Sequence, residues 1–154
     1  MENVPRILLA EDSPRDAELI ISALREFHVA NEILHVRDGA EALDYLFRRG
    51  AFADRPAGLP VVVMLDLKMP KVDGLEVLRQ IRADSNLKTL PVVIMTSSRE
   101  EQDVVRSYEL GTNSYVVKPI QFPEFVESVK KVGAYWAVIN EPPPGTVSAN
   151  RRAG

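Results

Sequence analysis

The stretch Val61-Val-Val-Met-Leu-Asp66 consists of five consecutive apolar residues followed by a carboxylate. An uninterrupted apolar run of this length is typical of a central strand that is covered on both faces. Leu67-Lys-Met-Pro70 follows at once, so the strand should end at Asp66. The carboxyl ends of such strands are where α/β proteins place their chemistry. Asp66 is therefore the first candidate functional residue.

Four other apolar runs alternate with segments of helical period. The five predicted strands cover residues 7–10, 33–36, 61–66, 92–95 and 115–117. The predicted helices begin at the capping residues Ser13, Asp38, Asp73 and Ser98, and a last helix runs from about Phe122 to Ile139. Five strand–helix units with short connections predict an α/β fold with one parallel, doubly wound five-stranded sheet and helices on both faces.

The composition is that of an ordinary soluble domain. The chain has 154 residues, of which 45% are hydrophobic and 27% are charged, and its net charge is −3. The absence of cysteine excludes disulfides, thiolate metal sites and cysteine nucleophiles. The charge gives no sign of nucleic-acid binding, no apolar run is long enough to span a membrane, and the N-terminus lacks a secretory signal. We therefore predict one cytoplasmic domain over residues 1–140 and a disordered, proline-containing tail at 141–154.

Polar side chains stand at the ends of four predicted strands. Glu11 and Asp12 follow the first strand, Asp66 the third, Thr96 the fourth and Lys118 the fifth. Since the carboxyl ends of parallel strands share one edge, we expect these residues to converge. Three neighbouring carboxylates repel one another and need a cation, and oxygen ligands without His or Cys favour Mg²⁺. The lysine and the hydroxyl would bind phosphoryl oxygens, which leaves Asp66 as the nucleophile that forms an acyl phosphate.

At these positions the chain resembles the receiver domain of two-component response regulators, the CheY-like superfamily. The resemblance covers about residues 6–139. It is carried by four motifs: Ile7-Leu-Leu-Ala-Glu-Asp12, Met64-Leu-Asp-Leu-Lys-Met-Pro-Lys-Val-Asp-Gly74, Val92-Val-Ile-Met-Thr-Ser97 and Tyr115-Val-Val-Lys-Pro119. Any one motif alone is weak, but four in order at family-like separations are highly specific. The resemblance implies a flavodoxin-like (βα)5 fold with strand order 2-1-3-4-5.

The resemblance implies a phosphoacceptor and its metal ligands. Asp66 is the expected phosphoacceptor. Glu11, Asp12 and Asp66 are the expected side-chain ligands of Mg²⁺, and the backbone carbonyl of Lys68 is a further expected ligand. Both Glu and Asp are common in the family at the position of Glu11, so a glutamate there does not weaken the expected metal site.

The resemblance also implies a switch. Thr96 and Lys118 are the expected phosphoryl-sensing pair, and Tyr115 matches the aromatic residue that turns inward when the threonine moves. Lys118-Pro119 resembles a cis bond that aims the lysine into the site. Basic Lys68, two residues after Asp66, and Ser98, two residues after Thr96, stand at positions that flank the route of attacking water in the family. They leave the phosphate lifetime open.

The last predicted helix has more apolar residues than one core-facing stripe requires. They are Phe122, Phe125, Val126, Val129, Val132, Tyr135, Trp136 and Ile139. Exposed apolar patches usually mark partner sites, so we expect homodimerisation through this helix region. The alternative is that the end of the helix packs under its own tail.

The function predicted from these features is that of a single-domain response regulator phosphorylated by a sensor histidine kinase. Tyr45-Leu-Phe-Arg-Arg-Gly50, the long 50–60 loop and the extended last helix resemble stand-alone regulators of phytochrome-type kinases. The surface of the fourth helix, fifth strand and fifth helix would then change its affinity for a partner. A phosphorelay intermediate and a phosphate sink remain alternatives. An aspartyl-phosphate phosphatase usually has a second acid where this chain has Lys68, and nucleotide-binding glycine motifs are absent.

Overall fold

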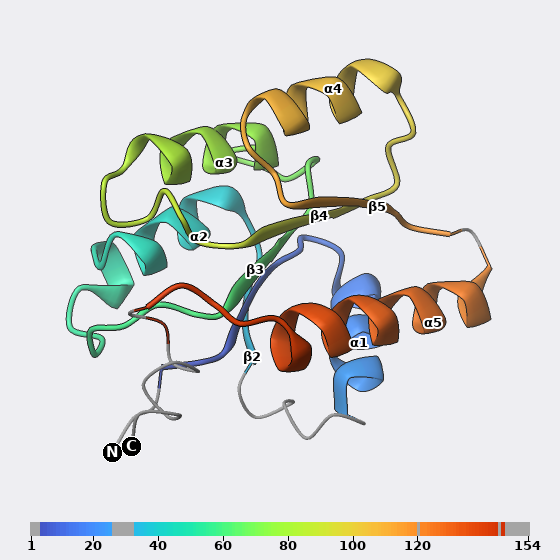
Figure 1. Ribbon diagram of the computed structural model, residues 1–154, viewed down its shortest axis with the longest axis horizontal. Coiled ribbons are helices and arrows are strands. Elements are labelled where there is room, and N and C mark those ends of the chain that lie inside the picture. Colours follow the sequence, from blue (N-terminus) through green and yellow to red (C-terminus); the bar gives the residue numbers. More distant parts are fainter. Residues whose placement is uncertain (1–3, 26–32, 120, 145, 147–154) are drawn as a thin grey trace.

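A computed structural model describes residues 4–25, 33–119, 121–144 and 146. Five parallel strands form one sheet in the order β2-β1-β3-β4-β5, which confirms the predicted doubly wound fold (Figure 1). The strands are β1 (Ile7–Ala10), β2 (Ile33–Val36), β3 (Val62–Leu65), β4 (Val92–Thr96) and β5 (Ser114–Val117).

Helices cover both faces of the sheet, with α1 and α5 on one face and α2, α3 and α4 on the other (Figure 1). The helices are α1 (Pro14–Leu24), α2 (Gly39–Leu46), α3 (Gly74–Ala83), α4 (Glu101–Glu109) and α5 (Phe122–Gly133). A short 3₁₀ helix, η3 (Gly50–Phe52), lies in the loop before β3, and a π-helical segment, η4 (Ala134–Ile139), continues α5. None of the helices in the described ranges is long and apolar enough to cross a membrane.

The three inner strands form the centre of two hydrophobic cores. Every residue of β1, β3 and β4 is buried, as the unbroken apolar run in β3 predicts. Side chains alternate between the faces, so Leu8 and Val63 pack with α2 and α3, whereas Ile7 and Val62 pack with α1 and α5. Full burial of such a side chain contributes about 1.5–3 kcal/mol. The inner strands therefore give the strand ends a rigid base.

Three of the four predicted helix caps are confirmed. Ser13 Oγ, Asp38 Oδ1 and Asp73 Oδ1 each accept a hydrogen bond from the backbone N–H three residues ahead, at 3.2, 2.8 and 3.0 Å. Each bond satisfies one free N–H group of the first helical turn. The first three helices therefore start where their capping residues place them, next to the ends of the strands.

The cap predicted at Ser98 is wrong, because α4 begins only at Glu101. Ser98 Oγ donates instead to Asp103 Oδ2 at 2.6 Å, and it accepts the Glu100 N–H at 3.4 Å. The serine therefore anchors the β4–α4 loop and leaves the first turn of α4 without a side-chain cap. Gly111 follows the end of α4 with φ 93°, a left-handed conformation that favours glycine.

The last helix reaches Ile139, as predicted, but its final six residues are π-helical. Tyr135 and Ile139 are exposed at this end, and Ala137 is buried. In the segment that follows, Pro142 and Thr146 are buried, and Thr146 forms a parallel bridge with Leu59. The remainder of the predicted disordered tail, residues 147–154, lies outside the described residues.

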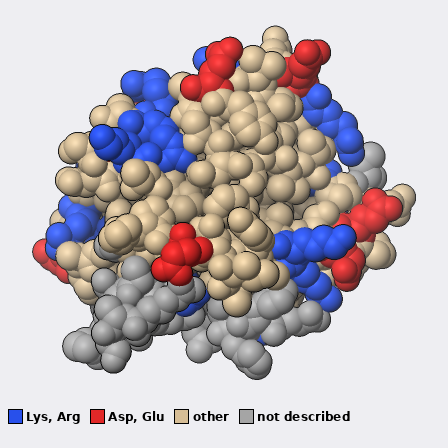
Figure 2. All heavy atoms as spheres, viewed as in Figure 1, with Lys and Arg blue, Asp and Glu red and all other residues tan. Residues whose placement is uncertain are grey.

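The surface seen from the side of Figure 1 has no single dominant sign of charge. Figure 2 shows Lys and Arg in separate groups toward the edge of this face, with Asp and Glu among them and uncharged residues over much of the centre. A mixed distribution of this kind exerts little long-range attraction on a charged partner.

Candidate functional site

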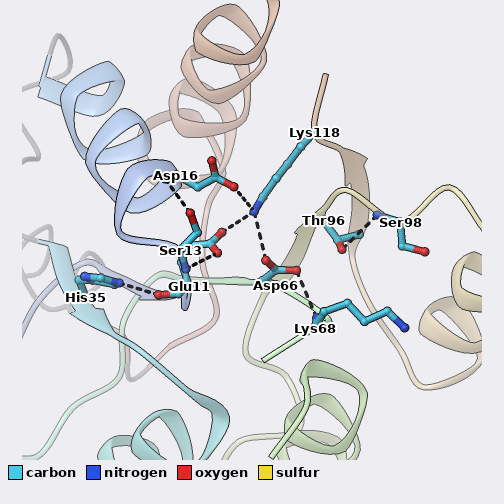
Figure 3. Close-up of polar contacts among 9 residues, drawn as sticks. All are labelled: Glu11, Ser13, Asp16, His35, Asp66, Lys68, Thr96, Ser98 and Lys118. Carbon is cyan, nitrogen blue, oxygen red and sulfur yellow. Dashed lines mark hydrogen bonds and ion pairs between the residues drawn. The ribbon is translucent and has the colours of Figure 1, made fainter. Parts of the chain in front are cut away.

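The predicted polar residues converge at the carboxyl edge of the sheet (Figure 3). Glu11, Asp66 and Lys118 directly follow β1, β3 and β5, and Thr96 is the last residue of β4. Because β1, β3 and β4 are neighbours and β5 pairs with β4, the four strand ends form one continuous row. The parallel topology thus brings together residues that are up to 107 positions apart in the sequence.

Lys118 is the cation of this cluster. Its Nζ donates hydrogen bonds to Glu11 Oε1 at 2.6 Å, Asp16 Oδ2 at 2.8 Å and Asp66 Oδ2 at 3.1 Å. Burial alone would lower the pKa of Lys118, but the hydrogen bonds to Asp16 and Glu11 and the charge of Asp66 raise it above its ordinary value. The ammonium therefore stays charged, and each of its three N–H groups has a carboxylate partner.

Asp16 is the member of this cluster that we did not predict from the sequence. It lies in the first turn of α1, and its own backbone N–H donates to the cap Ser13. The available signal was its distance of four residues from Asp12, which places both carboxylates near the start of one helix. Only the fold shows that this turn faces the end of β5.

Glu11 is almost fully buried and is held on several sides. Its Oε2 accepts the Ser13 N–H at 3.1 Å, and its backbone carbonyl accepts a hydrogen bond from His35 Nε2 at 2.8 Å. Burial raises the pKa of Glu11 to about 7, and the charge of Asp66 acts in the same direction against the hydrogen bond from Lys118. A cation that binds this carboxylate below about pH 7 must therefore compete with a proton.

Three carboxylates are placed to share one metal ion. Oxygen atoms of Glu11, Asp12 and Asp66 all lie within 4.8 Å of one another. An all-oxygen donor set suits a hard divalent cation such as Mg²⁺ or Mn²⁺. Asp12 is exposed, which leaves that side of the cluster open to water and to an incoming ligand. The role of the Lys68 carbonyl as a further ligand stays a prediction.

Gly74 allows α3 to start directly against Asp66. A Cβ at this position would lie 2.2 Å from the backbone carbonyl oxygen of Asp66, which no side chain can tolerate. The Gly74 N–H donates to Leu67 O at 2.9 Å, and the Asp66 N–H donates to Ala10 O at 3.1 Å. These contacts fix the backbone on both sides of the acidic cluster.

Thr96 and Tyr115 both contact Ser98. Thr96 Oγ1 accepts the Ser98 N–H at 3.3 Å, and the Tyr115 hydroxyl donates to Ser98 O at 3.0 Å. Burial raises the pKa of Tyr115, so its hydroxyl remains a neutral donor. The threonine and tyrosine predicted to act together are thus connected through one loop residue.

The expected cis bond before Pro119 is wrong, since every peptide bond in the described ranges is trans. The Lys118 N–H donates to Thr96 O at 2.7 Å and so extends the β4–β5 pairing by one residue. The lysine side chain reaches the carboxylates from this position.

We expect the affinity for Mg²⁺ to fall as the pH drops below about 7. A metal ion competes with the proton on Glu11, whose pKa is raised to about 7, so the affinity should decrease by up to about tenfold per pH unit below that value. Calorimetric titration near pH 6 and near pH 8 would measure the difference. Glu11→Gln should bind more weakly and lose the pH dependence; an unchanged dependence would remove Glu11 from the metal site.

Comparisons with known proteins agree with this geometry. The sequence profile of the response regulator receiver domain matches residues 7–130. Response regulator Rcp1 from Synechocystis sp. is 37% identical over 135 residues, which cover 87% of this chain and 90% of Rcp1. A crystal structure of Rcp1 in a Mn²⁺-bound form superposes with a TM-score of 0.81 at 35% identity and covers 89% of this chain and 97% of Rcp1.

Two further solved structures are similar over nearly the whole chain. The phosphorylated cyanobacterial phytochrome response regulator RcpA has a TM-score of 0.84 and 37% identity, covering 92% of this chain and 99% of RcpA. The bacteriophytochrome response regulator RtBRR has a TM-score of 0.72 and 55% identity, covering 98% of this chain and 91% of RtBRR. With the profile match, the strand order and the acidic cluster, these similarities show that the chain belongs to the response regulator receiver domain family.

Proposed function

We propose that Asp66 accepts a phosphoryl group from a partner histidine kinase and that the phosphorylated chain changes its affinity for other proteins. The observation that supports this most is the position of the Asp66 carboxylate. Its Oδ2 lies 3.1 Å from Lys118 Nζ. Oxygen atoms of Asp66, Glu11 and Asp12 lie within 4.8 Å of one another, close enough to bind one metal ion. A nucleophile, a fixed cation and an oxygen-ligand metal site are the parts that phosphoryl transfer requires.

Each residue of the site would have its own role in the reaction. A carboxylate oxygen of Asp66 attacks the phosphorus of phosphohistidine, the O–P bond forms, and the N–P bond to the kinase histidine breaks. Lys118 and the Thr96 hydroxyl bind phosphoryl oxygens, and Glu11 and Asp12 hold Mg²⁺ with Asp66. The metal ion supplies charge neutralisation for the same oxygens. Water then hydrolyses the acyl phosphate, which releases inorganic phosphate and restores the Asp66 carboxylate. The chain thus promotes its own phosphorylation and dephosphorylation and does not turn over a free substrate.

Acetyl phosphate offers a direct test that needs no kinase. We expect the purified protein to acquire one phosphoryl group in the presence of Mg²⁺, visible by Phos-tag electrophoresis, and to acquire none when EDTA removes the metal. The absence of labelling with Mg²⁺ would overturn the proposed function.

A phytochrome-type kinase is the partner that the comparisons favour. RcpA and RtBRR are described as phytochrome response regulators, and they are 37% and 55% identical to this chain. Phosphotransfer from such a kinase should therefore be faster than from an unrelated sensor kinase at equal concentration. Onward transfer to a histidine phosphotransfer protein would instead identify a phosphorelay intermediate, and rapid loss of the phosphoryl group with no partner would identify a phosphate sink.

The surface around β5 is where we place the change in partner affinity. β5 lies at the edge of the sheet between α4 and α5 (Figure 1). Tyr108 on α4 and Phe122 on α5 are each 53% exposed, and Ile139 at the end of η4 is 67% exposed. Large apolar side chains in these positions favour a protein partner, and a second copy of this chain is the partner we propose.

We expect the protein to sediment as a dimer, and Tyr135→Ser combined with Ile139→Asp to raise the dissociation constant at least tenfold. Both side chains are exposed apolar groups at the end of the last helix. Sedimentation velocity over a range of concentrations would measure the change. Arg49→Ser is the control, because it shortens an exposed side chain in the segment after α2, outside the surface formed by α4, β5 and α5. A wild-type monomer at high micromolar concentration would contradict the dimer.

A further inference from the structure

Asp103 is a buried carboxylate that none of the roles above uses. It lies in the first turn of α4 and is only 7% exposed. Its Oδ2 accepts the hydroxyl proton of Ser98 at 2.6 Å and lies 3.6 Å from Lys68 Nζ. Ser98 belongs to the β4–α4 loop, and Lys68 belongs to the loop between β3 and α3. One carboxylate on α4 therefore joins the two loops that follow Asp66 and Thr96.

The backbones of the same two residues hold the side chains of the phosphoacceptor site. The Lys68 N–H donates to Asp66 Oδ1 at 3.3 Å, and the Ser98 N–H donates to Thr96 Oγ1 at 3.3 Å. Figure 3 shows Lys68 and Ser98 on the side of Asp66 and Thr96 that is remote from Lys118. Asp103 thus contacts the side chains of Lys68 and Ser98. The backbone N–H groups of these two residues bind Asp66 and Thr96.

A general helix-capping role does not account for this arrangement. Acidic residues do stabilise the first turn of a helix through its dipole, and exposed Glu101 already supplies such a charge at the start of α4. Asp103 instead accepts a side-chain hydrogen bond from five residues earlier and pairs with a lysine from another loop. Its carboxylate therefore connects α4 to two residues outside the helix.

We propose that Asp103 is a positioning residue that holds Ser98 and Lys68 in the unphosphorylated arrangement and so sets how readily Thr96 can turn to a phosphoryl group. A rotation of Thr96 toward a phosphoryl group on Asp66 moves Thr96 Oγ1 relative to the Ser98 N–H, and Asp103 keeps Ser98 in place. A phosphoryl group on Asp66 attracts the Lys68 ammonium away from Asp103, which loosens the same loop. The acceptor and α4 are thereby coupled through one carboxylate; this rests on the proposed role of Asp66.

Asp103→Ala removes both contacts and is the main test, whereas Asp103→Asn keeps an acceptor for Ser98 and removes only the charge that Lys68 needs. Glu109→Gln is the control, because it changes an exposed carboxylate at the other end of α4. Two quantities are measured: amide hydrogen exchange of residues 97–100 without phosphate, and the rate at which acetyl phosphate labels the chain.

We expect loop exchange to be at least tenfold faster in Asp103→Ala and within about threefold of wild type in Asp103→Asn. Labelling should be at least fivefold faster in Asp103→Ala, because the contacts of Asp103 with Ser98 and Lys68 no longer oppose the movement of Thr96. When Ser98→Ala is already present, Asp103→Ala should add less than twofold to either rate. If Asp103 only stabilised α4, Asp103→Ala would change both rates by the same factor in wild type and in Ser98→Ala.

The idea fails if Asp103→Ala resembles Glu109→Gln in loop exchange, or if the effects of the Asp103 and Ser98 substitutions simply multiply. These results are separable from those on the proposed function. If the wild-type chain is not labelled at all, Asp66 is not a phosphoacceptor, and the exchange rates still decide whether Asp103 positions Ser98.

Discussion

Asp66→Asn should reduce labelling by acetyl phosphate to below about 1% of the wild-type level while leaving the fold intact. The amide has nearly the same shape as the carboxylate but lacks the nucleophilic oxygen that forms an acyl phosphate. The amide oxygen of the new side chain could still accept a hydrogen bond from Lys118, so the buried ammonium keeps a partner at this position. The loss of labelling would therefore report chemistry and not unfolding. Phos-tag electrophoresis measures the labelling, and circular dichroism checks the fold.

The matched control is Asp73→Asn, which changes an exposed cap at the start of α3 near the acceptor. It should lower stability by about 1 kcal/mol or less and leave labelling unchanged, because asparagine also caps helices. Asp12→Asn is more informative, since it should slow labelling at low Mg²⁺ and recover when the metal concentration rises. Labelling that persists in Asp66→Asn would place the phosphoryl group on another side chain and refute the assignment.

The elements of the fold could be predicted from the sequence because their signals are local. The apolar run ending at Asp66 marks a central strand, and the strand is fully buried in the structure. Capping at Ser13, Asp38 and Asp73 depends on a hydrogen bond to a residue three positions ahead, so it can be recognised without the fold. The convergence of the strand ends also follows from the parallel topology.

Two of the differences from the sequence-based prediction arise from side-chain pairs. Ser98 does not cap α4 because Asp103 accepts its hydroxyl proton. Asp16 joins the site because Lys118, 102 positions away, has a third N–H group to satisfy. Neither pairing has a fixed spacing that a sequence pattern could reveal.

Lys118→Met should destabilise the metal-free protein by about 3 kcal/mol. The substitution keeps most of the buried side-chain volume but leaves Glu11, Asp16 and Asp66 without their shared cation. Removing one partner of a buried ion pair costs about 3–5 kcal/mol, and the partial exposure of Asp16 lowers the expected value toward the bottom of that range. Urea unfolding without metal would measure the loss. Lys71→Met is the control, because this exposed lysine pairs with Asp38 at 3.4 Å and should cost less than about 1 kcal/mol.

Mg²⁺ should restore a large part of the stability lost in Lys118→Met. The lysine and the metal ion neutralise overlapping sets of carboxylate oxygens, so removal of the lysine leaves more negative charge for the ion to bind. We therefore expect the variant to bind Mg²⁺ more tightly than wild type and to gain more free energy of unfolding from saturating metal. It should nevertheless be labelled by acetyl phosphate far more slowly, because the metal ion cannot take the position of the ammonium beside the phosphoryl oxygens. Equal stabilisation of wild type and variant by Mg²⁺ would show that the lysine and the metal ion do not share these carboxylates.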